Sequence, residues 1–421
     1  MAVAARRGGN RRGMSDWLRG SYDDAALAFG GGVVRYGELT RSVGATMLPS
    51  GEGPVGCPAG ADPVALVTTL LAALERGRPV LVGGTQAEAD RIADRLPAGT
   101  ELAVLTSGSS GPSGTPRVVA RTNASWLASA APLAAITGLD ARDRIAVTGP
   151  LHVSMHLYAA LHALWLGASV GDEFAGATAM HATPTRLSRA LDDPACPPAA
   201  VVAGAAMSSS LRSRAAERGI RITEYYGAAE LSFVLAGRGG ELAPFPGVEV
   251  DLRPAGAGDE LWARSPYLAI GVVGGGMLRR DAVGFATVGD LAERMATDSV
   301  RVLGRGDAAI TTAGVTVLAE QVEACIAALP GVSAAAVLGE PHELLGERVL
   351  AVVELADGVE LDHVVTAARS ALSPVELPRR WFVRAVPRTA SGKVARGMLR
   401  DELAAGTLGD VYPAPFERSA S

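Results

Sequence analysis

A stretch of small hydroxyl side chains and glycines, Thr106–Arg117, is the part of the sequence best suited to binding a polyphosphate. It follows the apolar run Leu102–Leu105, which predicts a short buried strand that ends where the glycines begin. Glycine lets the backbone approach an anion, hydroxyls donate hydrogen bonds to its oxygens, and Arg117 supplies a fixed positive charge. The residues expected to line this phosphate loop are Thr106, Ser107, Gly108, Ser109, Ser110 and Gly111. An exposed Gly/Ser linker is the alternative that this stretch alone leaves open.

A second stretch, TEYYGAAE at residues 223–230, offers groups that would complement a phosphate loop. Its tyrosines present an aromatic face that can cover an adenine ring, and the glycine behind them leaves room for a phosphate. Glu230 can hold Mg²⁺ through a hard carboxylate oxygen. The nucleotide-binding candidates here are Tyr225, Tyr226, Gly227 and Ala228. A tyrosine pair packed in the core beside an exposed glutamate is the alternative.

Two further motifs carry isolated charges. Asp290 ends the sequence Val-Gly-Asp and Arg305 follows Gly304, so a carboxylate and a guanidinium presented at strand ends would suit the diol of a ribose. Lys393 stands after a glycine in PRTASGKVAR at residues 387–396, where it could reach into a site made by another part of the chain. Each of these motifs, taken alone, is also typical of a surface ion pair or a solvated loop.

Composition limits the classes of function. The 421 residues suggest two or three domains, with 48% apolar and 20% charged side chains, as in globular proteins. Net charge is −5, which argues against a general nucleic-acid or anionic-membrane binder. Three separated cysteines without a CxxC motif predict reduced thiols and a cytoplasmic location. No apolar run reaches the roughly 18 to 20 residues of a membrane span, and residues 1–13 are expected to be a disordered extension.

The elements that would carry these motifs alternate between strand and helix from about residue 63 to 225, which predicts a largely parallel sheet covered by helices. Residues 237–290 are rich in glycine and short strand patterns, which indicates a β-rich subdomain. We expect an α/β core over residues 14–305, a small mobile α+β domain over 306–405 and a tail over 406–421. Residues 15–60 are expected to be irregular, with weak strands at Ala25–Phe29 and Val33–Tyr36.

Taken together, the motifs resemble those of the adenylate-forming superfamily, which includes acyl- and aryl-CoA synthetases, peptide-synthetase adenylation domains and luciferases. The resemblance runs in order through TSGSSG…PR at 106–117, YGAAE at 226–230, VGD at 288–290, GRGDAAITTAGVTVLAEQVE at 304–323 and PRTASGKVAR at 387–396. It implies that a carboxylate attacks the α-phosphate of ATP to give an acyl-adenylate. A thiol, from coenzyme A or from the phosphopantetheine of a carrier protein, then takes the acyl group and AMP leaves.

The resemblance also implies roles for single residues. Lys393 would lie between the carboxylate and the α-phosphate during the first half-reaction only, and Asp307 would be the hinge of the small domain. His152 matches the gate beside the acyl pocket; His156, four residues on, gives a spacing that suits zinc on a helix, but no third ligand stands near. The remaining implied contacts are Glu230 with Mg²⁺, Tyr226 with adenine, Gly204, Ala205 and Ala206 with the base edge, and Asp290 and Arg305 with ribose.

Several positions depart from the family pattern. Arg117 replaces the usual lysine, and Ala229 and Val288 replace hydroxyl residues, which would remove about 1 to 3 kcal/mol of polar contact if nothing compensates. Glu230, Asp290, Arg305 and Lys393 all remain, so an active enzyme is the leading interpretation and an inactive ligand-binding or scaffolding homologue is the alternative. The expected substrate is a fatty or aromatic acid. A carrier protein and a second copy of the chain are the macromolecular partners considered, the latter because the chain is short.

Overall fold

The computed structural model describes residues 16–106, 117–255, 258–274, 278–295, 299–305, 309–312, 315–389 and 392–413. The described chain forms two compact units. The first unit contains residues up to 105, 118–179 and 269–273; the second contains residues 106, 117, 180–268 and those from 274 onward. The expected extension at residues 1–13, the hinge residue Asp307 and the loop residues Ser107–Gly111 lie outside the described residues.

The first unit contains two groups of strands, one of them in the order β16-β6-β5-β4-β3. In this group β3, β4 and β5 are parallel, and β16 is antiparallel to β6. Helices α2 and α3 lie between successive parallel strands along the chain, which is the predicted alternation. The bounds are β3 (Val55–Pro58), α2 (Pro63–Glu75), β4 (Val80–Gly83), α3 (Gln86–Ile92), β5 (Leu102–Thr106), β6 (Arg117–Arg121) and β16 (Gly271–Val273), with a 3₁₀ turn at Ala93–Arg95.

The other group of strands in the first unit has the order β7-β8-β1-β2. Parallel pairing joins β7, β8 and β1, and the hairpin strand β2 is antiparallel to β1. The bounds are β1 (Ala25–Phe29), β2 (Gly32–Arg35), α1 (Tyr36–Ala45), α4 (Asn123–Thr137), β7 (Arg144–Val147), α5 (Ser154–Leu166) and β8 (Ser169–Gly171).

Helix α1 corrects the expectation that residues 15–60 are irregular. The backbone N–H of Arg35 donates to the Glu38 carboxylate at 2.9 Å, which satisfies one donor at the start of the helix. Leu39 and Val43, four residues apart, are fully buried on one side of the helix. The Tyr36 hydroxyl donates to the carbonyl of Ala168 at 2.7 Å and so fastens the first turn to the unit. Both short strands expected in this region are present.

Five strands of the second unit follow the order β13-β12-β11-β10-β9. Parallel pairing joins β9, β10 and β11, whereas β12 is antiparallel to both of its neighbours. The carboxyl end of β11 therefore turns directly into β12, and this turn carries the second predicted motif. The bounds are β9 (Ala179–Ala182), α6 (Pro184–Ala190), β10 (Ala199–Val202), α7 (Ser209–Glu217), β11 (Arg221–Ala228), β12 (Ser232–Arg238) and β13 (Glu241–Pro244).

A β-rich segment follows, as the sequence predicts. Its sheet has the order β17-β18-β15-β19-β20, with β14 paired to β15. All pairings in it are antiparallel, so its strands are joined by short turns rather than crossover helices. The bounds are β14 (Glu249–Ala255), β15 (Gly258–Arg264), β17 (Arg279–Arg280), β18 (Ala286–Thr287), β19 (Asp290–Arg294) and β20 (Val300–Arg305).

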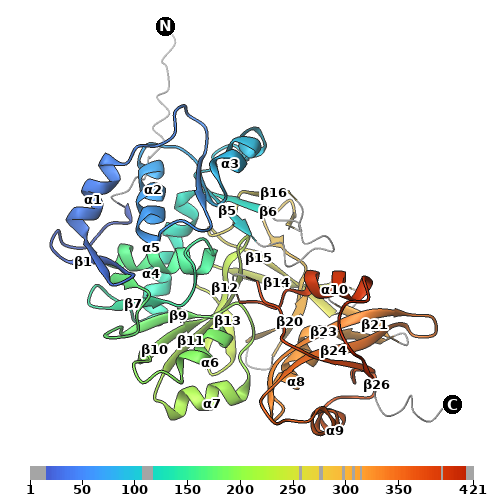
Figure 1. Ribbon diagram of the computed structural model, residues 1–421. Helices are drawn as coiled ribbons and strands as arrows, with labels where there is room; N and C mark the ends of the chain where they lie inside the picture. Colours follow the sequence, from blue (N-terminus) through green and yellow to red (C-terminus); the bar gives the residue numbers. More distant parts are fainter. Residues whose placement is uncertain are drawn as a thin grey trace. The chain divides into compact units, whose positions relative to one another are not determined.

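The C-terminal sheet is covered by helices on both faces (Figure 1). On β25, Trp381 packs with residues of α8 and α9, whereas its neighbour Phe382 packs with Leu399 of α10. Consecutive strand residues point to opposite faces, so the pair divides the core into two layers. The bounds are β21 (Ala309–Thr312), β22 (Val315–Leu318), α8 (Ala319–Ala327), β23 (Val332–His342), β24 (Gly346–Leu355), α9 (Leu361–Ala371), β25 (Arg380–Val383), α10 (Arg396–Ala404) and β26 (Tyr412–Pro413).

A buried histidine joins α4 to α5 in the first unit. His162 is fully buried, and its Nε2 lies 3.0 Å from the carbonyl oxygen of Ala130. Its ring stacks between those of Tyr158 and Trp165, with centroids 5.9 and 6.0 Å away. Burial lowers the pKa of His162 to about 4, so the ring is neutral and its Nε2–H donates to Ala130 at neutral pH.

His162 should make the stability of the protein fall with acid. An unfolded histidine titrates near pH 6.5 and the folded one near 4, so between these values only the unfolded chain binds the proton. The stability contributed by the neutral ring is present above pH 6.5 and is lost as the pH falls toward 4, by about 1.4 kcal/mol per pH unit. Urea unfolding at pH 7.5 and at pH 5.0 gives the unfolding free energy that each protein loses between the two pH values. This loss should be about 2 kcal/mol smaller in His162→Gln than in the unmodified protein. Equal losses in the two proteins would contradict this assignment.

Candidate active site

Nearly all of the predicted site residues that are described belong to the second unit, from Thr106 and Arg117 to Lys393. The exception is His152, which precedes α5 in the first unit. Burial lowers the pKa of His152, although a hydrogen bond with the backbone of Ala59 opposes the shift. Its role as a gate stays a prediction. His156 is fully buried in α5, and the described chain has no group of three or more histidine, cysteine or acidic side chains placed to hold a metal ion.

A buried ion pair joins the phosphate-loop motif to the Tyr-Gly motif. Arg117 Nη2 lies 2.8 Å from Glu230 Oε1, and the side chains are 8% and 1% exposed. The Thr106 hydroxyl donates to the backbone carbonyl of Arg117 at 3.2 Å, so the strand residues on both sides of the phosphate loop are held together. Glu230 is therefore not the exposed glutamate of the alternative interpretation. Its carboxylate lies directly beside the cation that ends the phosphate loop.

The turn that carries Glu230 depends on a glycine. A β-carbon on Gly227 would lie 2.0 Å from the carbonyl oxygen of Ser232, so no larger residue fits at this β-bulge. On β11, Tyr225 packs its ring against Phe233 with centroids 4.6 Å apart. The next residue, Tyr226, donates its hydroxyl to Oδ2 of Asp290. Of the two candidate tyrosines, the structure thus joins Tyr226 to the predicted ribose ligand.

The backbones of Asp290 and Arg305 lie opposite each other in the β-rich sheet. Asp290 is the first residue of β19 and is 8% exposed, and it stands directly opposite Arg305, the last residue of β20, in the antiparallel register. The pairing explains how residues fifteen positions apart in the sequence come to one edge of the β-rich sheet. Their contact with a ribose diol stays a prediction.

The turn before Asp290 contains a hydroxyl that sequence reasoning missed. Thr287 is fully buried, and its Oγ1 accepts a hydrogen bond from the backbone N–H of Gly289 at 3.1 Å. The residue before Val288 therefore supplies a hydroxyl to the backbone of this turn, whereas Val288 itself has none. The sequence feature that could have indicated this contact is the threonine directly before the Val-Gly-Asp motif.

The lysine loop packs on two other segments of the second unit. If Gly204 had a β-carbon, that atom would lie 3.8 Å from Lys393 Cε. A β-carbon on Gly392 would lie 3.3 Å from Thr183 Oγ1. Both glycines have positive φ, at +94° and +83°. Glycine at these positions lets Lys393 approach the turn between β10 and α7, where Gly204, Ala205 and Ala206 were expected to meet the base.

Arg388 fastens this loop, and sequence reasoning assigned it no role although it stands inside the lysine motif. Its Nη1 donates to Thr185 Oγ1 at 3.1 Å and to the carbonyl of Gly392 at 3.0 Å. The loop also closes on itself, because the backbone N–H of Thr389 donates to the carbonyl of Lys393 at 2.8 Å. Lys393 is the only lysine of the whole chain; all other basic side chains apart from histidine are arginines.

The described helices include none that is both long and apolar enough to cross a bilayer. The second unit thus contains one ammonium group at Lys393, the buried carboxylate of Glu230 paired with Arg117, and the buried carboxylate of Asp290. That combination suits chemistry at the phosphate of a nucleotide.

Comparison with known proteins points to the same chemistry. Residues 321–393 match the family described as AMP-binding enzyme C-terminal domain. The chain is 26% identical to the uncharacterized acyl-CoA ligase YhfT of Bacillus subtilis, over 69% of this chain and 67% of that protein. It is 28% identical to a probable 2-succinylbenzoate-CoA ligase of Mycobacterium tuberculosis, over 81% and 96%.

A solved structure shares the fold. ATP-bound MatB from Rhodopseudomonas palustris superimposes with a TM-score of 0.77 at 19% identity, covering 94% of this chain and 98% of that one. The predicted fold class is therefore confirmed. The motif order, the C-terminal family match and the curated relatives agree with it, and together they support the adenylate-forming enzyme superfamily.

Proposed function

We propose that this protein is an AMP-forming ligase that activates a carboxylic acid as its acyl-adenylate and transfers the acyl group to coenzyme A. The observation that carries the proposal is the approach of the only lysine, on its glycine loop, to the turn after β10 in the unit that also holds Glu230 and Asp290. Relatives named as CoA ligases support the reaction class.

Attack of a carboxylate on the α-phosphate joins two anions, so the step depends on cations more than on a base. The Lys393 ammonium would lie between them, because a point charge on a flexible stem can serve two oxygens at once. Asp290 and Arg305 would hold the ribose. Tyr226 would cover the adenine, and its hydrogen bond to Asp290 would fix the ring plane relative to the sugar.

Glu230 fits the part of a magnesium ligand. Its carboxylate is a hard oxygen donor, and Mg²⁺ is commonly held by one or two carboxylates together with substrate phosphates. When bound, the ion would neutralise charge on the phosphates. The ion pair with Arg117 would hold the carboxylate at the end of the phosphate loop, since both side chains are buried and each compensates the other.

For the acid, we propose a fatty or aromatic compound, because the segments 203–207 and 226–233 that flank the lysine and the tyrosine are small or apolar apart from Glu230 and the tyrosine itself. Coenzyme A is the proposed acceptor, with a carrier-protein phosphopantetheine as the alternative, since the reacting thiol is the same. The cytoplasmic location, the homodimer and the domain limits at 14–305 and 306–405 stay predictions from the sequence.

The test is ATP–pyrophosphate exchange over a panel of fatty, aromatic and amino acids, followed by thioester formation on coenzyme A or on a carrier protein. Exchange with a fatty or aromatic acid and a coenzyme A thioester would support the proposal. Exchange with transfer only to a carrier protein would favour the alternative acceptor. No exchange with any acid, in a protein that still binds ATP, would favour an inactive binding homologue.

Lys393→Ala should separate the two half-reactions. Removing one preorganised donor lowers adenylation by about 10²-fold to 10³-fold, while thioester formation from supplied acyl-AMP should stay largely intact. Single-turnover assays of each half-reaction provide the measurement. Arg221→Ala, which removes one exposed positive charge at the start of β11, is the matched control and should change neither rate. Equal loss of both half-reactions in Lys393→Ala would contradict the assigned role.

A double-mutant cycle should reveal the buried ion pair. Arg117→Met leaves the Glu230 carboxylate buried without its cation, which should lower the free energy of unfolding by about 3 to 5 kcal/mol. Adding Glu230→Gln should recover a large part of that loss, because no buried charge remains uncompensated. Urea unfolding of the two single variants and the double variant measures the coupling. Additive losses would show that the two side chains do not stabilise each other.

A further inference from the structure

A buried carboxylate lies one strand away from the predicted ribose ligand. Glu260, on β15, is 6% exposed, and its two oxygens accept from different donors. Oε1 accepts from Thr287 Oγ1 at 3.0 Å and Oε2 from the Trp262 indole N–H at 3.2 Å. Arg279 pairs with the same carboxylate. None of the functions assigned so far uses this buried acid.

The Thr287 hydroxyl is made directional by this partner. A hydroxyl has one proton, and an ionised carboxylate can only accept, so the proton of Thr287 points to Glu260. Its lone pairs then face the backbone N–H of Gly289, which donates to Oγ1 at 3.1 Å. The hydrogen bonds therefore run in one direction, from the N–H of Gly289 through Thr287 to Glu260. Asp290 is the residue that follows Gly289 in the chain.

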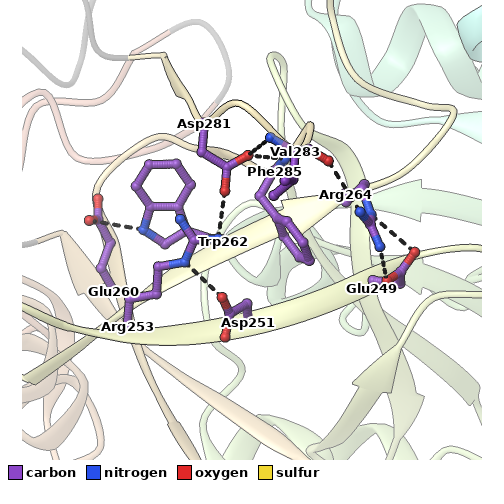
Figure 2. A network of polar contacts seen from close by, with 9 residues as sticks. All are labelled: Glu249, Asp251, Arg253, Glu260, Trp262, Arg264, Asp281, Val283 and Phe285. Carbon is purple, nitrogen blue, oxygen red and sulfur yellow. Dashed lines mark hydrogen bonds and ion pairs between the residues drawn. The ribbon is translucent and has the colours of Figure 1, made fainter.

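The strand that carries Thr287 is itself anchored (Figure 2). Arg253 lies over the rings of Trp262 and Phe285, at 4.3 and 5.3 Å from their centroids. It also donates to Asp281, whose other oxygen accepts from the backbone N–H of Phe285 at 2.8 Å. The turn that enters β18 is thus held on both sides, two residues before Thr287. A network of this kind fixes backbone position more firmly than a single hydrogen bond.

We propose that Glu260 and Thr287 are positioning residues that aim the Asp290 carboxylate at the ribose hydroxyls of the nucleotide. Glu260 orients the Thr287 hydroxyl, the hydroxyl holds the N–H of Gly289, and this sets the direction in which Asp290 leaves the turn. Tyr226 holds the same carboxylate from β11. The proposal rests on the proposed function only in that Asp290 binds ribose.

Binding of AMP and of 2′,3′-dideoxy-AMP, measured by titration calorimetry, tests the proposal without knowledge of the acid. Hydrogen bonds to a charged group predict that the unmodified enzyme prefers AMP by about 10-fold to 100-fold. Thr287→Val keeps the side-chain shape but removes the hydroxyl, and it should reduce this preference to about 3-fold or less. Thr287→Ser is the matched control, because it keeps the hydroxyl, and it should retain the preference.

Glu260→Gln is the second variant, should Thr287→Val fail to fold. A glutamine has an NH₂ group in place of one of the two carboxylate oxygens, so either Trp262 or Thr287 loses its acceptor. The preference for AMP should therefore fall in this variant as well. Asp290→Ala is the reference: it should abolish the preference, and if it does not, the ribose site is wrong. If Asp290→Ala abolishes the preference while folded Thr287→Val or Glu260→Gln keeps it, the positioning role is overturned and the proposed function stands. Loss of thermal stability with an unchanged preference would likewise show a merely structural role.

Discussion

Two anions must meet when a carboxylate attacks a phosphate, and the need to neutralise them governs the arrangement of this protein. The chain has a single ammonium side chain, that of Lys393. Its loop packs closely at two glycines: Lys393 approaches Gly204, and Gly392 approaches Thr183. Every other fixed cation is a guanidinium, which is planar and suited to bidentate contacts. A compact charge that can bridge two oxygens is thus supplied once, where the proposed reaction needs it. The buried pair of Arg117 and Glu230 keeps the neighbouring charges compensated.

Rigid placement of the nucleotide would come from backbone rather than from large side chains. Gly227 allows β11 to approach Ser232 more closely than any β-carbon would permit, and this places Glu230 beside Arg117. Asp290 stands opposite Arg305 in the strand register, and its carboxylate accepts a hydrogen bond from the Tyr226 hydroxyl. Buried polar groups of this kind are costly unless each has a partner, so the partners define one arrangement.

The sequence predicts those features that depend on neighbours along the chain. Helix α2 lies in the predicted alternation, and its limits follow from local residues, because Asp62 caps it, Pro63 begins it and Gly77 follows it. Helix α1 was missed because the Tyr36 hydroxyl in its first turn bonds the carbonyl of Ala168, far along the chain, and no local pattern contains that contact. In the site, the motifs identified Asp290, Arg305 and Lys393 as candidates, but not their partners. The bonds of Tyr226 to Asp290, of Arg388 to Thr185 and of Glu260 to Thr287 join separate strands and helices, so no local pattern contains them. Thr287 illustrates this limit, because its hydroxyl accepts from Gly289 nearby but donates to Glu260 on another strand.

The proposed reaction is defined by the bond of ATP that the acid breaks. The direct measurement uses an acid that supports pyrophosphate exchange, labelled with ¹⁸O in its carboxylate, in a complete reaction with ATP and coenzyme A followed by mass spectrometry of the phosphate products. Attack on the α-phosphate leaves one labelled oxygen in AMP, because the thiol later cleaves the bond between the acyl carbon and that oxygen. We expect AMP heavier by one ¹⁸O and unlabelled pyrophosphate. Label in inorganic phosphate, with ADP as the nucleotide product, would contradict the account.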